Sequence, residues 1–208
     1  MKKYLLVSIL FFICISIKAQ EPNSISLNAY GGYTLMDRVR FDAAYADVQP
    51  GFEYGGGLEY FVNRDHSLEV KYKRMDATFP LYGPGGSKLN PNHDQGSIQF
   101  ITIGGNTYFA RTTDQKAIPF IGGALGVGIL TGPENSKTAF GWDIQAGVKI
   151  KTGSAVSLKL NAYLQSAVSS FGTDFWYYPG WGTVAVADYA TLLQFGVGGA
   201  ICFDFKRK

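Results

Sequence analysis

Few residues of this 208-residue chain have the types and spacing that could support catalysis. Of the two histidines, His66 stands alone, whereas His93 is followed by Asp94 and has Ser87 and Ser97 within six residues. A nucleophile within hydrogen-bonding reach of a histidine base could hydrolyse or transfer an acyl group, so this cluster is the candidate site of a lipid-modifying enzyme. The same residue types are common in solvated loops. We therefore expect no catalytic site.

Metal and cofactor sites are not expected either. The two cysteines, Cys14 and Cys202, are far apart, and no Cys/His cluster has the spacing of metal ligands. The glycine-rich run "GGALGVG" at 122–128 is followed by more strand-like sequence. A phosphate-binding loop needs a helix directly after its glycines, so this run does not predict nucleotide binding.

A more regular feature is the spacing of ionisable side chains within long apolar segments. In "AVSLKLNAYLQSAVSS", residues 155–170, Leu158 and Leu160 alternate with Ser157, Lys159 and Asn161. Successive side chains of a strand point to opposite faces, so the segment is predicted to form a strand with one apolar and one polar face. It is longer than the five or six residues of an average soluble strand.

Eight segments of this kind occur, and none shows the 3.6-residue period of a helix. They cover residues 24–36, 52–62, 67–78, 97–109, 117–130, 138–151, 155–168 and 191–205. Short connections (63–66, 110–116 and 152–154) alternate with longer ones (37–50, 79–96, 131–137 and 169–190). Short turns at one end and longer loops at the other are typical of outer-membrane barrels. The predicted fold class is all-β, an eight-stranded antiparallel up-and-down transmembrane β-barrel over residues 20–208.

The polar faces of these strands are expected to point into the barrel. A Lys or Arg facing lipid at mid-bilayer costs about 2–4 kcal/mol, and the lysines of the strands lie on one face of each strand. An eight-stranded interior is just wide enough to be filled by side chains, so we expect ion pairs and a plugged lumen. The predicted lumen network is Glu53, Glu59, Glu69, Lys71, Lys73, Asp143, Lys149, Lys159 and Asp204. Arg74 places a charge on the apolar face of the segment 67–78. Either a β-bulge shifts the alternation there, or the Arg74 side chain reaches the head-group zone.

Aromatic residues are expected at the membrane interfaces and in the last long connection. Those near strand ends are Tyr33, Tyr60, Tyr72, Phe109, Trp142, Phe203 and Phe205. The connection at 169–190 holds Phe171, Phe175, Trp176, Tyr177, Tyr178, Trp181 and Tyr189. An exposed aromatic cluster of this size predicts a binding surface for an extracellular ligand or a partner outer-membrane protein. The alternative is that these rings belong to the outer interfacial belt.

The N-terminus has the features of a cleaved export signal. Lys2 and Lys3 precede an apolar run from Leu5 to Ile17, and cleavage is expected after Ala19. The run is too short to span a bilayer as a helix. Residues 1–19 hold three of the 19 basic residues and none of the 16 acidic ones, so residues 20–208 carry no net charge. A neutral mature chain argues against a nucleic-acid partner.

The sequence resembles a family of membrane proteins. The export signal, the eight amphipathic strands, "GGLEYFVNRDHSLEV" at 56–70, "IPFIGGALGVGIL" at 118–130 and the aromatic end of the last strand are similar to small outer-membrane β-barrels of the OmpA-membrane-domain and OmpX type. The resemblance implies an outer-membrane location, contact with outer-membrane lipid and insertion by the barrel-assembly machinery. In this chain Lys206, Arg207 and Lys208 follow the terminal aromatic residue Phe205, which departs from the family pattern.

Two other interpretations are kept open. A soluble lipocalin-like barrel would have its apolar face inside, around a ligand, and its charges outside. A small barrel enzyme acting on outer-membrane lipid would use the cluster around His93. The expected function is a non-enzymatic outer-membrane protein with structural or surface-binding roles.

Overall fold

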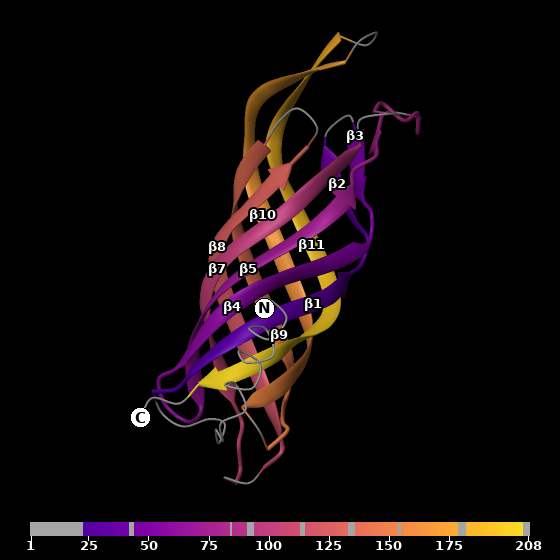
Figure 1. Ribbon diagram of the computed structural model, residues 1–208. Coiled ribbons are helices and arrows are strands. Elements are labelled where there is room, and N and C mark those ends of the chain that lie inside the picture. Colours follow the sequence, from indigo (N-terminus) through magenta and orange to yellow (C-terminus); the bar gives the residue numbers. More distant parts are fainter. Residues whose placement is uncertain are drawn as a thin grey trace, which may run out of the picture.

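Eight long strands form most of the molecule (Figure 1). The computed structural model describes residues 23–41, 44–83, 85–90, 94–112, 115–132, 136–153, 155–178 and 182–205, with residues 40, 41, 44, 169–178 and 182–190 described by their backbone alone. The predicted export signal lies outside the described residues. The long strands are β1 (Ile25–Thr34), β4 (Gly51–Phe61), β5 (His66–Thr78), β7 (Gln95–Tyr108), β8 (Ala117–Thr131), β9 (Ser136–Lys151), β10 (Val156–Tyr178) and β11 (Gly182–Phe205).

The eight strands close into an antiparallel barrel in the order β1-β11-β10-β9-β8-β7-β5-β4, which confirms the predicted fold class. Following paired residues once around the barrel from Ala29 on β1 leads to Thr191 on β11. Ala29 itself pairs with Ile201 on the other side, ten residues from Thr191. This stagger tilts the strands by roughly 40° and leaves an interior that side chains can fill.

The barrel is apolar outside and charged inside. Ile103, Phe52 and Leu125 are 62%, 60% and 58% exposed, whereas Lys149 and Glu59 are completely buried. A water-soluble protein has the opposite distribution, because exposing large apolar side chains and burying charges both cost free energy in water. The lipocalin-like arrangement, with charges on the outer surface, is therefore wrong.

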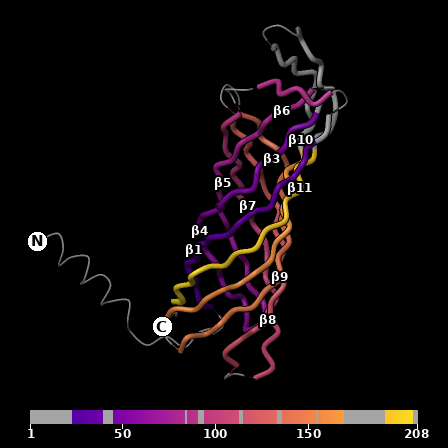
Figure 2. Tube along the Cα trace, turned by 90° about the vertical axis from the view of Figure 1, so that its right-hand side faces the viewer, coloured from indigo at the N-terminus to yellow at the C-terminus, as the bar shows by residue number. Residues whose placement is uncertain are grey.

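A second, smaller sheet lies across one end of the barrel. It consists of β2 (Asp37–Phe41), β3 (Ala44–Val48) and β6 (Leu81–Tyr82), in the order β2-β3-β6. This end, where the longer connections lie, is called the loop end, and the opposite end is called the turn end (Figures 1 and 2). The predicted long connections 37–50 and 79–96 thus contain strands that the alternation in the sequence did not reveal.

The last two barrel strands extend well beyond the predicted bounds. Residues 169–190 were predicted to be a long connection, but β10 continues to Tyr178 and β11 starts at Gly182, paired except at a register shift between Phe171 and Asp174. Figure 1 shows this hairpin rising beyond the other strands at the loop end. Aromatic and β-branched residues such as Val184 and Val186 favour strands, and the two segments pair through the backbone groups on their facing edges without a third strand.

Arg74 lies on the outer face of β5 in an unbroken strand. Pairing of β5 with β4 and β7 runs without a register shift past this position, so the predicted β-bulge is wrong. The guanidinium of Arg74 instead contacts the carboxylate of Asp76 at 2.7 Å, and Tyr54 donates a hydrogen bond to the same carboxylate. No helix long and apolar enough to cross a membrane occurs in the part of the chain that the structure describes.

Candidate functional site: the charged interior of the barrel

The nine ionisable residues singled out in the sequence all lie on inward faces of the barrel. None is more than 6% exposed. The strand alternation explains their placement, because each occupies a position that faces inward while its neighbours face outward. They are Glu53, Glu59, Glu69, Lys71, Lys73, Asp143, Lys149, Lys159 and Asp204.

A single ammonium group joins two carboxylates near the middle of this interior. Lys159 Nζ lies 2.7 Å from Glu59 Oε2 and 3.5 Å from Glu69 Oε1. The three residues come from β10, β4 and β5, so the contact crosses the barrel. A buried charge without a partner is strongly destabilising, which makes this shared lysine important for both carboxylates.

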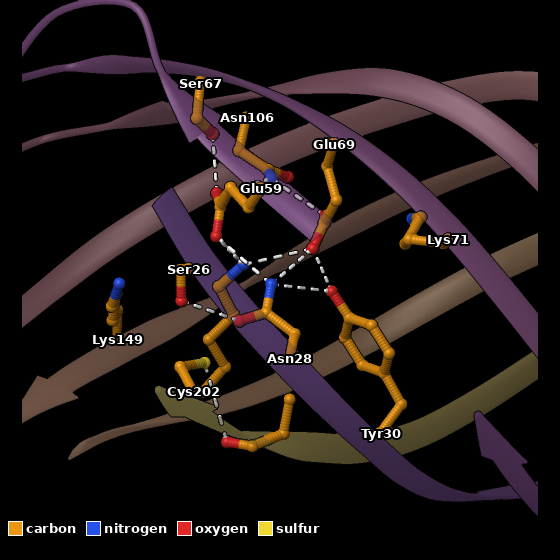
Figure 3. Close-up of polar contacts among 12 residues, drawn as sticks. Ser26, Asn28, Tyr30, Glu59, Ser67, Glu69, Lys71, Asn106, Lys149 and Cys202 are labelled. Atoms are coloured by element: carbon orange, nitrogen blue, oxygen red, sulfur yellow. Dashed lines mark hydrogen bonds and ion pairs between the residues drawn. The ribbon is translucent and has the colours of Figure 1, made fainter. Parts of the chain in front are cut away.

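Neutral donors complete the coordination of these two carboxylates (Figure 3). Asn28 Nδ2 donates to Glu69 at 2.6 Å and to Glu59 at 3.2 Å, and Asn106 Nδ2 donates to both at 3.0 Å. Tyr30 donates its hydroxyl to Glu69. Glu59 also accepts hydrogen bonds from Ser67 Oγ and Tyr108 Oη, at 2.5 and 2.6 Å. These bonds replace the water that both groups lose on burial.

Two further ion pairs lie on either side of this centre. Lys71 Nζ contacts Asp143 Oδ1 at 2.6 Å, with Thr102 donating to the other carboxylate oxygen. Lys149 Nζ contacts Asp204 Oδ1 at 3.0 Å. The second oxygen of Asp204 accepts a hydrogen bond from Ser157 at 2.6 Å.

A fourth pair lies nearer the loop end. Lys73 Nζ contacts Glu53 Oε1 at 3.0 Å, and Gln165 bridges the two by accepting from the lysine at 2.6 Å and donating to the carboxylate at 2.7 Å. Lys73 also lies 4.5 Å from the centroid of the Tyr163 ring. All five buried carboxylates of the predicted network therefore contact a lysine.

Apolar layers lie above and below the charged region. At the turn end, Phe61, Tyr108, Ile118 and Phe120 are buried together, with ring centroids of Phe61 and Phe120 each 5.5 Å from that of Tyr108. At the loop end the buried cluster is Val39, Val48, Met75, Ile98, Phe100, Ala139, Ala167 and Leu192. Val39 and Val48 come from β2 and β3, so the small sheet covers the apolar mouth of the barrel.

A polar cavity of about 20 Å³ remains between the ion pairs. Its lining includes Lys71, Lys73, Glu53 and Tyr163, and also the inward glycines Gly32 and Gly198. The volume is enough for one water molecule, and the lining offers the polar partners that a buried water requires. The inward glycines therefore leave room beside the charged layers.

The candidate catalytic cluster is not brought together in the described part of the chain. His93 lies outside the described residues. Asp94 accepts a hydrogen bond from Lys88 at 2.7 Å, and this contact lowers the pKa of the Asp94 carboxyl. His66 lies at the turn end, where its Nδ1 is 3.2 Å from Thr107 Oγ1. No group of three His, Cys, Asp or Glu side chains that could hold a metal ion occurs among the described residues.

The predicted aromatic binding surface falls on residues whose side chains are not described. Phe171, Phe175, Trp176, Tyr177, Tyr178 and Tyr189 lie in the extended hairpin of β10 and β11, and Trp181 lies outside the described residues. Cys202 is a free, buried thiol on the inward face of β11.

The neutral members of the interior were not assigned a role from the sequence. Asn28, Tyr30, Asn106, Gln145 and Gln165 all face inward, as strand alternation indicates, but amide and hydroxyl groups do not identify their own partners. Their inward positions could have predicted that they form hydrogen bonds, because polar side chains inside a narrow barrel must bond to one another or to the charged groups.

Comparison of the sequence with protein-family models and with curated proteins gives no match. The structure, by contrast, is similar to solved outer-membrane proteins. OprG from Pseudomonas aeruginosa superposes with a TM-score of 0.63 at 12% identity, over 92% of this chain and 100% of OprG. Neisserial surface protein A gives 0.53 at 14% identity, over 86% and 96% of the two chains. The chain has the fold of the small outer-membrane β-barrels.

AlkL, an outer-membrane protein solved in lipid bilayers, agrees with this assignment. Its TM-score is 0.52 at 11% identity, over 92% of this chain and 94% of AlkL. At such low identity the similarity concerns the small outer-membrane β-barrel fold alone.

Proposed function

We propose that this chain is an integral outer-membrane protein of the OmpA-membrane-domain or OmpX type, with a plugged interior and no catalytic activity. Residues 1–19 would be removed on export, leaving Gln20 as the N-terminus. The observation that carries the proposal is the inverted distribution of side chains: the large apolar residues Ile103 and Leu125 are 62% and 58% exposed, and the charged residues Lys149 and Glu59 are completely buried. Only a lipid environment makes this distribution stable in a closed barrel.

The proposal of a plugged interior is supported by the pairing of its charged side chains. Four lysines and five carboxylates contact one another, and apolar clusters lie at both ends of the charged region. A hydrated ion would have to break these contacts to pass. We therefore propose that the interior stabilises the barrel and that function resides in the loop end.

The loop end would present a binding surface for an extracellular ligand or a partner outer-membrane protein. Support comes from the length of β10 and β11, 23 and 24 residues, which carries the aromatic segment beyond the barrel. Aromatic residues are enriched where proteins bind partners. The competing hypothesis, a lipid-modifying enzyme, depends on His93.

Fractionation tests the membrane placement. The protein should sediment with outer membranes, begin at Gln20, and migrate faster on gels before heating than after, as closed barrels do. Recovery in the soluble fraction, or one mobility at all temperatures, would contradict the proposal. A His93→Ala variant with altered lipid turnover relative to the wild type would replace it with the enzyme hypothesis.

The three tryptophans allow a matched test of the binding surface. Trp176→Ser with Trp181→Ser should abolish capture of the partner from outer membranes while the barrel still folds. Trp142→Ser, on the outer face of β9 within the barrel, should leave capture unchanged. Equal capture by all the variants would place the binding surface elsewhere.

A further inference from the structure

The charges outside the barrel interior are unequally distributed between its two ends. The connections at the loop end (37–50, 79–96, 131–137 and 169–190) hold seven carboxylates and four cations. At the turn end lie Arg64, Arg111, Lys116 and Lys151, and the sequence continues from Phe205 with three more cations at 206–208. By sequence, the acidic residues in the connections 63–66 and 110–116 and before Asn23 are Glu21, Asp65 and Asp114. Residues 20–208 thus carry no net charge, but the loop-end connections have an excess of acidic residues and the turn-end segments an excess of basic residues.

Three of the turn-end cations, Arg64, Arg111 and Lys116, have no acidic partner among the described residues. Arg111 and Lys116 are exposed and Arg64 is half-buried. One terminal nitrogen of Arg64 is buried without a hydrogen-bond partner. At the loop end, by contrast, Arg38 contacts Asp47 at 2.6 Å and Lys88 contacts Asp94 at 2.7 Å.

These cations lie at the edge of the apolar outer surface. Arg64 follows Val62 by two residues, Arg111 follows Phe109 by two, and Val62 and Phe109 are 48% and 55% exposed. Lys116 directly precedes β8. Long basic side chains in such positions run their apolar stems along the surface and place the charge at head-group level.

We propose that the turn end of the barrel binds the anionic head groups of phospholipids in the leaflet that surrounds it. The inference rests on the membrane placement proposed above. A cation near an anionic lipid surface gains a favourable interaction that falls off within a Debye length. Position favours a lipid over a soluble polyanion, because Arg64 and Arg111 follow exposed apolar side chains of the outer surface and Lys116 directly precedes β8.

Lipid titration of the folded barrel in zwitterionic micelles provides the test. Phosphatidylglycerol and phosphatidylethanolamine with identical acyl chains are compared by native mass spectrometry and by the shift in unfolding temperature. Phosphatidylglycerol should bind about tenfold more tightly at low salt, and this preference should weaken as salt is added.

Two triple variants remove the same number of charges from opposite ends. R64Q/R111Q/K116Q should lose most of the preference for phosphatidylglycerol. R38Q/R74Q/K88Q, at the loop end, should retain it. Equal binding of the two lipids, or a preference unaffected by the turn-end variant, would overturn the inference.

Two further outcomes separate this inference from alternatives. Tighter binding of a soluble polyanion such as peptidoglycan fragments than of phosphatidylglycerol, abolished by R64Q/R111Q/K116Q, would overturn it in favour of a glycan partner. Loss of heat-modifiable mobility in the wild-type protein would contradict the membrane placement itself. A closed barrel without lipid preference would contradict only the inference drawn here.

Discussion

At the scale of single residues, Lys159 has the most demanding position in the molecule. It is buried, it reaches Glu59 and Glu69 from the opposite side of the barrel, and it lies 5.5 Å from the ring centroid of Phe120. Truncating one member of a buried ion pair leaves the other charge without compensation, which costs far more than the pair itself contributes. The stability of this barrel should therefore be unusually sensitive to single charges inside it.

Replacing Lys159 with methionine keeps most of the side-chain volume and removes the charge. We expect Lys159→Met to lower the free energy of unfolding by about 3–5 kcal/mol, because Glu59 loses its nearest cation. Urea unfolding in lipid bilayers, followed by tryptophan fluorescence, measures the change.

The control is a lysine in an exposed ion pair. Lys88→Met removes the contact with Asp94 at the loop end and should cost less than about 1 kcal/mol. Adding Glu59→Gln to Lys159→Met should recover part of the loss, since the uncompensated carboxylate disappears. Equal costs for the two lysine variants would show that the interior charges are solvated.

At the scale of secondary structure, glycines make the tight curvature of the barrel wall possible. A Cβ atom at Gly55, on the inner face of β4, would lie 2.0 Å from the carbonyl oxygen of Tyr72 on β5. Gly104 and Gly126 show the same approach to the neighbouring backbone, at 2.0 Å each. Glycine within a strand often marks a sharp bend or a close approach of another backbone.

Neighbouring glycines in β4 provide a matched pair for testing this role. Gly55→Ala should destabilise the barrel by about 1–3 kcal/mol, because the backbone of Tyr72 must move. At Gly56 the nearest atom to an added Cβ is 3.5 Å away, so Gly56→Ala should have little effect. Refolding yield and the midpoint of urea unfolding measure both, and similar midpoints would contradict the steric explanation.

The β2–β3 hairpin is the second element whose role follows from its contacts. Asp37 Oδ2 accepts a hydrogen bond from the backbone N–H of Leu193 at 2.7 Å, and β1 has already ended at Thr34. Val39 and Val48 are 8% and 1% exposed in the apolar cluster below. The hairpin is thus attached to the free edge of β11 and closes the mouth of the barrel.

Asp37→Ala should loosen this hairpin without unfolding the barrel. Loss of the acceptor frees the amide of Leu193, whose hydrogen exchange should accelerate, and residues 37–48 should become more sensitive to protease. Asp65→Ala at the turn end is the control and should change neither measurement. Unchanged exchange at Leu193 in Asp37→Ala would show that the apolar contacts alone hold the hairpin.

At the scale of the whole molecule, the interior consists of a charged middle between two apolar ends. Because each apolar layer excludes water by itself, removing one should leave the other to block ions. The proposed plugged interior therefore makes a prediction that involves both layers together.

Phe61→Ala with Phe100→Ala should raise conductance across planar bilayers above that of the bare membrane, because water that enters past both apolar layers weakens the ion pairs that a passing ion must break. The wild type and each single variant should show no discrete channel openings, since one apolar layer persists in each. Single-channel recording measures this. Openings in the wild type would contradict the plugged interior, whereas a silent double variant would mean that the ion pairs alone block the lumen.

Strand alternation, together with the alternation of short and long connections, was sufficient to predict an eight-stranded up-and-down barrel and which charges face inward. Lys149 and Lys159 could be assigned to the inner face because a period of two leaves each side chain only two directions, and lipid excludes charge from one of them.

Only the tertiary structure decided which inward groups meet. The sharing of Lys159 by Glu59 and Glu69 depends on the stagger of strands around the closed barrel, which alternation within a strand does not specify. The attachment of Asp37 to Leu193 and the extension of β10 and β11 through 169–190 likewise arise from contacts between distant segments. Local periodicity determines which face a residue occupies, and closure of the barrel determines its partner across the interior.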